Sequence, residues 1–341
     1  MRIIDLAMDD RLLRVLEDGD DVEHDTVRLD AGRLQCVAGP ATDPGVLTVG
    51  TFEAGGLRWT GDPRGDSFAP DRFERLAIGE DDPVTALSIS AHDDAVLYAG
   101  TEPSRLYRST DGGDRWESLD GLADVPSASE WFFPPRPDTH HVRWMTDDPG
   151  DPDRLYVGVE AGAFVLSPDG GETWIDRPSG ARRDNHSLAT HPDRPGLVYA
   201  AAGDGFAMST DGGESWETPQ VGLDHRYCWS VVVDPGDPER VLVSSASGAS
   251  RAHRATSAES YVYRMQGEDA WERLDDRGLP TGRGVVRNEF ATGERPGVVY
   301  AANNRGLYRT EDFGDAWERL PFEWDEALTE GTPRGLLVRT E

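Results

Sequence analysis

The chain has 341 residues, and 64 acidic side chains against 34 basic ones give it a formal net charge of −30. All of the basic residues are arginine, and lysine does not occur. Such a surface has no basic stripe that would release phosphate counterions, so the composition argues against nucleic acid and anionic membranes as partners. No run of about 18 apolar residues occurs, so we expect no membrane-spanning helix.

The first ten residues, Met1 to Asp10, reach charged side chains before the apolar segment of a signal peptide could form, so we expect a cytoplasmic protein. The acidic, lysine-free composition resembles that of proteins from halophilic archaea. In molar salt the Debye length is about 3 Å, which would screen the self-repulsion of this surface. On this interpretation the acidity is an adaptation to salt and carries no information about a ligand.

Segments with strand character follow one another along the chain. Three short strands are predicted at 3–7, 11–16 and 22–29. Six longer units follow, and each reads as a strand, a turn rich in proline and aspartate, a more aliphatic strand, a third strand, a polar turn and a fourth strand. Their approximate bounds are 31–77, 82–121, 139–178, 184–220, 226–275 and 283–322. Cys36 and Cys228 lie in apolar strands and are expected as buried thiols, not as a disulfide.

A short polar turn that ends in tryptophan recurs in these units. It is clearest at 209–216, where the sequence is Ser-Thr-Asp-Gly-Gly-Glu-Ser-Trp, and it recurs closely at 109–116 and 167–174 and more loosely at 310–317. Decayed copies lie at 53–59 and 266–271. The aspartate can accept hydrogen bonds from backbone N–H groups of the turn, and the glycines supply positive φ, so each copy predicts a tight hairpin.

The turn and its flanking strands resemble the Asp-box, or BNR repeat, of sialidases and related β-propellers, whose pattern is Ser/Thr-x-Asp-x-Gly-x-Thr-Trp. Several copies in register over nearly the whole chain indicate a repeat architecture. The resemblance implies an all-β, seven-bladed β-propeller in which the box joins the third and fourth strands of a blade, opposite the ligand face. It also implies a structural role for the box residues. These are Asp111, Trp116, Asp169, Trp174, Asp211, Trp216, Asp312 and Trp317.

The last segment is expected to close the ring. Residues 332–339 resemble the start of the sixth unit at 281–287, but no room remains for further strands. We expect this segment to supply the first strand of a composite blade formed by 1–30 and 332–341, which makes the whole chain one propeller domain. Strands from both ends would then remove an exposed sheet edge and tie the termini together.

The propeller resemblance implies a ligand site near the axis, formed by the loops that enter each innermost strand and those that join second and third strands. These loops hold five of the 8 histidines and a group of arginines, although the protein as a whole is acidic. Arginine suits carboxylate and phosphate recognition, so the pattern favours a small anionic or carbohydrate ligand. The candidate binding residues are His141, Arg143, Asp184, His186, Arg226, Tyr227, Arg251, His253, Arg283 and Asn303. The same loops hold Glu160, Asp204 and Arg254.

Three classes of function remain open, and the first is a sialidase-like glycoside hydrolase or glycan binder. The resemblance implies an arginine triad on a substrate carboxylate, for which Arg143, Arg226 and Arg283 are the right residue types, with Tyr227 beside them. The Phe/Tyr-Arg-Ile-Pro motif of that family is absent, and no Tyr/Glu pair matches by motif. The alternative for these arginines is structural, as partners of carboxylates on neighbouring blades.

In the second class, His141, His186 and either His253 or His225 hold a divalent metal that polarises a substrate or activates water, although no spacing such as HxxxH accompanies them. The third class is a non-catalytic scaffold, as in the propellers that assist photosystem II assembly, which have similar repeats. Its docking surface for a protein partner would be the aromatic run from Trp131 to Phe133. Alternatively, this run folds beneath its own loop as a small core.

Overall fold

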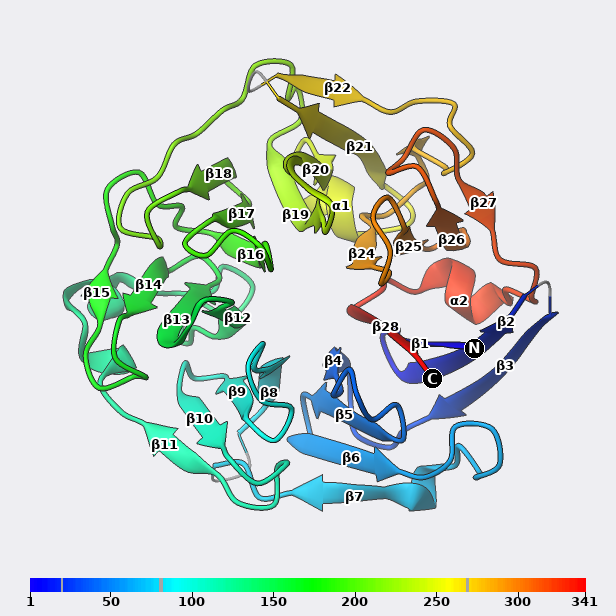
Figure 1. Cartoon of the computed structure of the whole chain (residues 1–341), viewed down its shortest axis with the longest axis horizontal. Helices are drawn as coiled ribbons and strands as arrows, with labels where there is room; N and C mark the ends of the chain where they lie inside the picture. Colours follow the sequence, from blue (N-terminus) through cyan, green and yellow to red (C-terminus); the bar gives the residue numbers. More distant parts are fainter. Residues whose placement is uncertain (20, 80–81, 268–269) are drawn as a thin grey trace.

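The strands of the chain form seven antiparallel sheets arranged in a ring, with the first strand of each sheet nearest the central axis (Figure 1). This is the seven-bladed β-propeller that the repeats predict, and the all-β prediction is confirmed. The structure, a computed structural model, describes residues 1–19, 21–79, 82–267 and 270–341.

Four of the sheets consist of four consecutive strands, ordered here from the axis outward. They are β4 (Leu34–Ala38), β5 (Val46–Thr51), β6 (Gly56–Thr60) and β7 (Phe73–Leu76); β8 (Val84–Ile89), β9 (Leu97–Thr101), β10 (Leu106–Ser109) and β11 (Glu117–Leu119); β12 (Val142–Asp148), β13 (Asp151–Val159), β14 (Ala163–Ser167) and β15 (Ile175–Asp176); and β24 (Glu289–Thr292), β25 (Val299–Asn303), β26 (Gly306–Thr310) and β27 (Glu318–Arg319).

The other three sheets depart from this plan. One has three strands, β16 (Asn185–Thr190), β17 (Val198–Ala202) and β18 (Gly205–Ser209). Another contains β19 (Tyr227–Asp234), β20 (Asp237–Ala246), β21 (Glu259–Gln266) and β22 (Trp271–Arg273), with β23 (Gly282–Arg283) also paired to β21. The last is the composite sheet of β28 (Gly335–Thr340), β1 (Arg2–Ala7), β2 (Arg11–Asp18) and β3 (Asp21–Arg28).

The helices are short and lie in connections between strands. The α-helices are α1 (Ala249–His253) and α2 (Glu326–Glu330), and turns of 3-10 helix occupy 70–72, 122–124 and 126–130. None of the helices in the described residues has the length and apolar character needed to cross a membrane.

The middle strands of the blades are buried because a neighbouring blade packs on each face. The whole of β9 (Leu-Tyr-Ala-Gly-Thr), β14 (Ala-Phe-Val-Leu-Ser) and β17 (Val-Tyr-Ala-Ala-Ala) is buried. The outermost strands are short and charged, as in β11 and β27, and they are largely exposed. Short charged edges discourage pairing with another chain, so the ring keeps its apolar surface between the blades.

The polar turns at 109–116, 167–174 and 310–317 form the predicted hairpins between third and fourth strands. The turn at 209–216 follows the third strand β18, and beyond it a single bridge joins Met208 and Glu217 in place of a fourth strand. The decayed copy at 53–59 departs from the prediction, because it spans the turn from the second strand β5 to the third strand β6.

In the clearest copy, Asp211 Oδ1 accepts a hydrogen bond from the backbone N–H of Ser215 at 2.9 Å, and Ser209 Oγ accepts one from Gly213 at 2.9 Å. Gly213 adopts φ 84°, a conformation that glycine tolerates without strain. The Trp216 ring packs edge-on against Phe164 of the preceding blade, with centroids 4.7 Å apart. These contacts give the turn a structural role.

Both ends of the chain meet in the composite sheet, as predicted, and the two termini lie side by side (Figure 1). The strand β28 pairs with β1 from Arg2 opposite Thr340 to Ala7 opposite Gly335. Beneath this pair, Asp5 is buried between two arginines and accepts hydrogen bonds from Arg339 at 2.6 Å and Arg14 at 2.8 Å. The ring is therefore closed by backbone pairing and by a buried ionic cluster.

Both cysteines are buried and free, as their strand contexts predict. Cys36 lies on β4 and Cys228 on β19. Burial raises the pKa of each thiol to about 12, so neither forms a thiolate at neutral pH.

Candidate functional site

A cavity of about 560 Å³ opens at the end of the axis where the innermost strands begin. Its lining comes from the entries to β4, β12, β16, β19 and β28, from the turn after β13, from the loop before β12 and from α1. The polar turns at 109–116, 167–174, 209–216 and 310–317 follow the third strands and therefore lie at the opposite end of the blades. The lining residues are Arg33, Gln35, Phe133, Pro134, Pro135, Arg136, His141, Arg143, Glu160, Asp184, Tyr227, Trp229, Ala249, Ser250, His253, Arg254 and Arg334.

Six of the candidates from the sequence lie at this cavity. His141, Arg143, Asp184, Tyr227 and His253 line it directly. His186 is fully buried, and its Nε2 lies 3.7 Å from Oδ1 of the lining residue Asp184. The axial loops of three consecutive blades therefore bring these six residues together.

The remaining four candidates lie outside the lining. Arg226 is exposed, and its Nε lies 3.5 Å from the backbone oxygen of Leu223. Arg251 points to Glu259, 3.6 Å away, and Arg283 is carried away from the axis because β23 pairs with the third strand β21. Asn303 is buried and donates to Asn288 Oδ1 at 2.9 Å. Of the three arginines compared with a sialidase triad, Arg143 alone reaches the cavity.

Several lining residues were not candidates. Arg33 and Arg334 stand one residue before β4 and β28, and Trp229 lies on β19. Arg136 comes from the Pro-rich loop before β12. The rule that selects residues at innermost-strand entries would have found Arg33 and Arg334 if applied to the first and last blades as well.

The aromatic run before β12 divides between core and cavity. Trp131 is 5% exposed, and its Nε1 donates to Ser127 Oγ at 2.8 Å. Phe133 lines the cavity and packs edge-on against His141, with ring centroids 4.7 Å apart. Only Phe132 of the three is exposed, at 48%. The run is therefore mainly a small core that holds one side of the cavity.

A chain of ionic contacts fixes Glu160 in the cavity wall. His141 Nε2 lies 3.0 Å from Glu160 Oε2, and His141 Nδ1 lies 3.7 Å from Glu102. Arg136 in turn donates two hydrogen bonds to Glu102. Burial opposes the ionisation of Glu160, but the hydrogen bond from His141 and the charge of Arg143 outweigh it and hold its pKa well below the usual range. Glu160 is therefore an ionised carboxylate.

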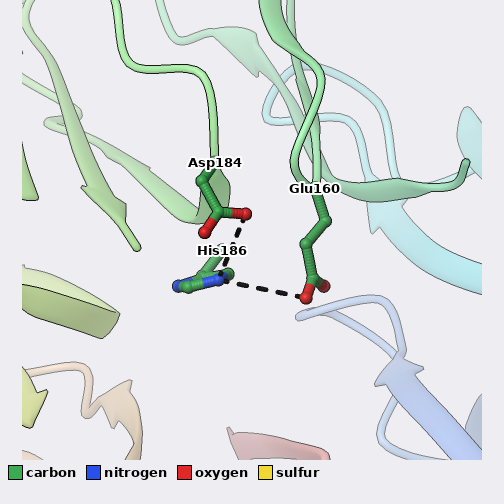
Figure 2. A group of neighbouring side chains, drawn as sticks. All are labelled: Glu160, Asp184 and His186. Atoms are coloured by element: carbon green, nitrogen blue, oxygen red, sulfur yellow. Dashed lines mark ion pairs between the residues drawn. The ribbon is translucent and has the colours of Figure 1, made fainter. Parts of the chain in front are cut away.

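Asp184 and His186 stand opposite Glu160, and the three side chains point toward one another (Figure 2). The Nδ1–H of His186 donates to the backbone oxygen of Cys228 at 2.6 Å, which leaves a lone pair on Nε2. Asp184 Oδ1 accepts from the backbone N–H of Ala161 at 2.8 Å. Burial raises the pKa of Asp184, and the neighbouring charge of Glu160 adds to this effect, whereas His186 opposes it. The pKa values of the two carboxyl groups are therefore displaced in opposite directions.

The indole ring of Trp229 packs against two arginine side chains, those of Arg287 and Arg143. The guanidinium carbon of Arg287 lies 3.8 Å and that of Arg143 4.8 Å from the centroid of the indole. Glu289 Oε1 accepts from Trp229 Nε1 and from Arg287 Nη1, each at 2.7 Å. Burial lowers the pKa of Arg287 to about 9. The packing keeps Arg143 at the cavity surface.

No protein-family model matches the chain. A xyloglucanase, Xgh74A of Acetivibrio thermocellus, is 26% identical over 226 residues, which covers 57% of this chain. This chain spans a quarter of the length of that relative, because the match covers 25% of it.

The solved structures similar to this one are also propellers. A GH74 enzyme of Niastella koreensis has a TM-score of 0.64 at 15% identity, covering 92% of this chain and 55% of its own. An ancestral GH74 enzyme has a TM-score of 0.63 at 16% identity, and the match covers 87% of this chain and 39% of that enzyme's chain. YCF48 bound to D1 peptide has a TM-score of 0.58 at 15% identity, covering 90% and 92%. At these sequence identities the similarity shows a shared fold alone.

Proposed function

We propose that the protein binds a small anionic ligand, of the sugar-acid or sugar-phosphate type, in the axial cavity. The observation that carries this proposal is the charge of the lining. Five arginines line the cavity against two carboxylates, Glu160 and Asp184, in a protein whose net charge is −30. Guanidinium groups recognise carboxylates and phosphates through paired hydrogen bonds, so this site favours an anion.

Three of these arginines keep donors for a ligand. Among the described residues, the side chains of Arg33 and Arg254 make no hydrogen bond or ion pair. The buried Arg143 approaches Glu160 and Glu289 only to 3.9 and 4.0 Å, beyond hydrogen-bond distance. Partial burial lowers the pKa of Arg33, with further contributions from other arginines nearby. A bound anion would relieve this repulsion.

The size and the apolar surfaces of the cavity suit a sugar. Its volume of about 560 Å³ lies within the range of about 300–1,000 Å³ that is usual for small-molecule sites. Phe133 and Tyr227 offer aromatic surface against which the apolar face of a sugar ring can pack. The ligand class therefore combines an acidic group with a carbohydrate ring.

Hydrolysis of a bound glycoside is the second candidate, and the carboxyl pair favours it. Glu160 is held ionised, whereas the pKa of Asp184 is raised. Carboxyl groups with pKa values displaced in opposite directions are suited to act as base or nucleophile and as acid. The xyloglucanase likeness agrees with this reaction class.

A scaffold that docks a protein or peptide is the alternative suggested by the likeness to peptide-bound YCF48. The aromatic run that would supply its docking surface exposes only Phe132 to a substantial extent. We therefore favour the small ligand, and we regard protein binding as the interpretation to follow if the ligand screen is negative.

The proposal is tested by isothermal titration of the untagged protein with glucuronate, galacturonate, sialic acid and glucose 6-phosphate, with glucose as the neutral comparison. We expect at least one anion to bind and Arg143→Gln to weaken it by at least about tenfold, the worth of one charge-assisted hydrogen bond. Arg295→Gln is the matched control, because Arg295 is exposed and pairs with Glu311 outside the cavity. Binding of none of the anions, or equal binding by Arg143→Gln, would reject the proposal.

Incubation with aryl glycosides of the same acids then tests the second candidate. Release of the aryl group by the wild type, and its loss in Glu160→Gln, would support hydrolysis. Binding without release would leave the protein a ligand-binding propeller.

A further inference from the structure

Glu160, Asp184 and His186 come together from the turn after β13 and from the entry to β16 (Figure 2). One ligand-type atom from each lies within 4.8 Å of the other two. Two carboxylates and an imidazole are donors that divalent transition metals accept. An acidic pair by itself is common on protein surfaces, so the histidine decides what this cluster can do.

The Nε2 atom of His186 is buried and makes no hydrogen bond within the described residues. Its ring is oriented from behind, because Nδ1–H donates to the backbone oxygen of Cys228 at 2.6 Å. This is the arrangement of a metal-binding histidine, in which a backbone acceptor fixes the tautomer and turns the lone pair toward the ion. A buried lone pair without a partner is costly unless something occupies the space before it.

The carboxylates face this lone pair at a distance that fits an ion between them. His186 Nε2 lies 3.7 Å from Asp184 Oδ1 and 4.0 Å from Glu160 Oε1, too far for hydrogen bonds. Two metal–ligand bonds of about 2.1 Å span up to about 4.2 Å. Glu160 Oε2 is engaged by His141, which leaves Oε1 as the oxygen turned to His186.

The backbone leaves room for this geometry at Gly203. A Cβ at this position would lie 1.9 Å from Asp184 Oδ2 and 3.2 Å from His186 Cε1. The backbone N–H of Gly203 also donates to the backbone oxygen of Asp184 at 2.8 Å. The close approach fixes Asp184 beside His186.

We propose that Glu160, Asp184 and His186 bind one divalent cation, Zn²⁺ or Mn²⁺, at the wall of the axial cavity. Glu160 and Asp184 line the cavity, so the remaining coordination positions face its interior. The cation would balance the two carboxylates and offer a positive centre beside the arginines. This proposal does not depend on the binding of an anionic ligand in the cavity. It is an alternative to the hydrolytic role of Glu160 and Asp184, because both carboxyl groups become metal ligands.

The test is metal binding by the untagged full chain. Protein purified without chelator is analysed by mass spectrometry for metals, and protein freed of metal by dialysis is titrated with ZnCl2 and with MnCl2. We expect one ion per chain, and a loss of affinity of at least about tenfold in Glu160→Gln and in His186→Gln. The control is His191→Gln, because His191 is also buried and its Nδ1 accepts from the backbone N–H of Asp193.

Two outcomes would overturn the proposal. One is a wild type that carries no metal and gives no heat with either ion. The other is an unchanged affinity in Glu160→Gln, which keeps the shape of the side chain and is expected to fold even where His186→Gln does not. The glucuronate titration is run on the same metal-free protein, so failure of the metal site and failure of the anion site are seen separately.

Discussion

The Nε–H of Arg287 donates a hydrogen bond to Nδ1 of His253 over 3.0 Å. An arginine can only donate, so the neutral imidazole carries its proton on Nε2. His253 Nε2 lies 3.0 Å from the hydroxyl of Tyr227 and must therefore donate to it. The Tyr227 O–H is left to donate to another acceptor, and Tyr227 is part of the cavity lining. The buried arginine thus turns a tyrosine into a directed donor.

Tyr227→Phe tests this donor. The substitution removes one hydroxyl from the cavity, and we expect the affinity for the anionic ligand to fall by about ten- to a hundredfold, as for a hydrogen bond to a charged group. Titration calorimetry with the anion that binds the wild type measures the change. Tyr261→Phe is the control, because the Tyr261 hydroxyl donates to Glu259 away from the lining. Equal affinities of Tyr227→Phe and wild type would show that the hydroxyl does not contact the ligand.

The pH dependence of stability is expected to carry a contribution from His253. Burial, followed by the positive charges of Arg287 and Arg334, lowers the pKa of His253 to about 2, against the opposing charge of Glu160. The unfolded chain takes up the proton near pH 6.5, but the folded chain does not. The contribution of the neutral His253 to the free energy of unfolding is therefore present above pH 6.5. It is lost as the pH falls below this value, by up to about 1.4 kcal/mol per pH unit.

Urea unfolding at pH 7.5 and at pH 5.5 measures this effect in the wild type and in His253→Gln. We expect the wild type to lose about 1 kcal/mol more than the variant between the two pH values, because glutamine does not titrate. The titration of the many carboxylates is common to both proteins and cancels in the comparison. An equal loss of stability in the wild type and the variant would mean that His253 has the same pKa in the folded protein as in the unfolded chain.

Arg339→Met tests the closure of the ring. Arg339 and Asp5 are both buried, with side chains 1% and 0% exposed, and Arg339 belongs to the C-terminal strand. Removal of one partner from a buried ionic cluster costs about 3–5 kcal/mol, so we expect a lower free energy of unfolding in urea. Arg295→Met removes an exposed pair and should leave stability unchanged. A variant as stable as the wild type would show that Arg14 alone satisfies Asp5.

Gly203→Ala tests the placement of Asp184. The added methyl group would meet Asp184 Oδ2 at 1.9 Å, so the carboxylate must shift from its position beside His186. We expect the affinity for Zn²⁺ or Mn²⁺ to fall by at least about tenfold, as when the support of a ligand is removed. Gly248→Ala is the matched control in the same set of axial loops, because a Cβ there meets nothing within 4 Å. Unchanged metal binding in Gly203→Ala would place the ion elsewhere.

Much of the fold could be predicted from the sequence because its signals are local and repeated. The turn at 209–216 encodes a hairpin by its aspartate and glycines, and its recurrence implies blades that stack on one another. The likeness of the last segment to earlier strand entries predicted that it would complete the composite sheet, and β28 does so beside β1. Apolar strand context was sufficient to predict that Cys36 and Cys228 are buried and free.

The site could be predicted only in part, because loop position selects residues without fixing where their side chains point. The entry rule found His141, Arg143 and Tyr227, which line the cavity. It also selected Arg283, but β23 pairs with β21 and carries this arginine away from the axis.

The sequence by itself determined the ring, since strand alternation and turn chemistry act over a few residues and are repeated in each blade. The tertiary structure alone decided which loops meet. Arg33 and Arg334, which lie near opposite ends of the chain, line one cavity because the composite sheet closes the ring. Glu160 faces His186 because β13 and β16 belong to adjacent blades whose ends converge at the axis. Such distances depend on the packing of whole blades, which no local pattern encodes.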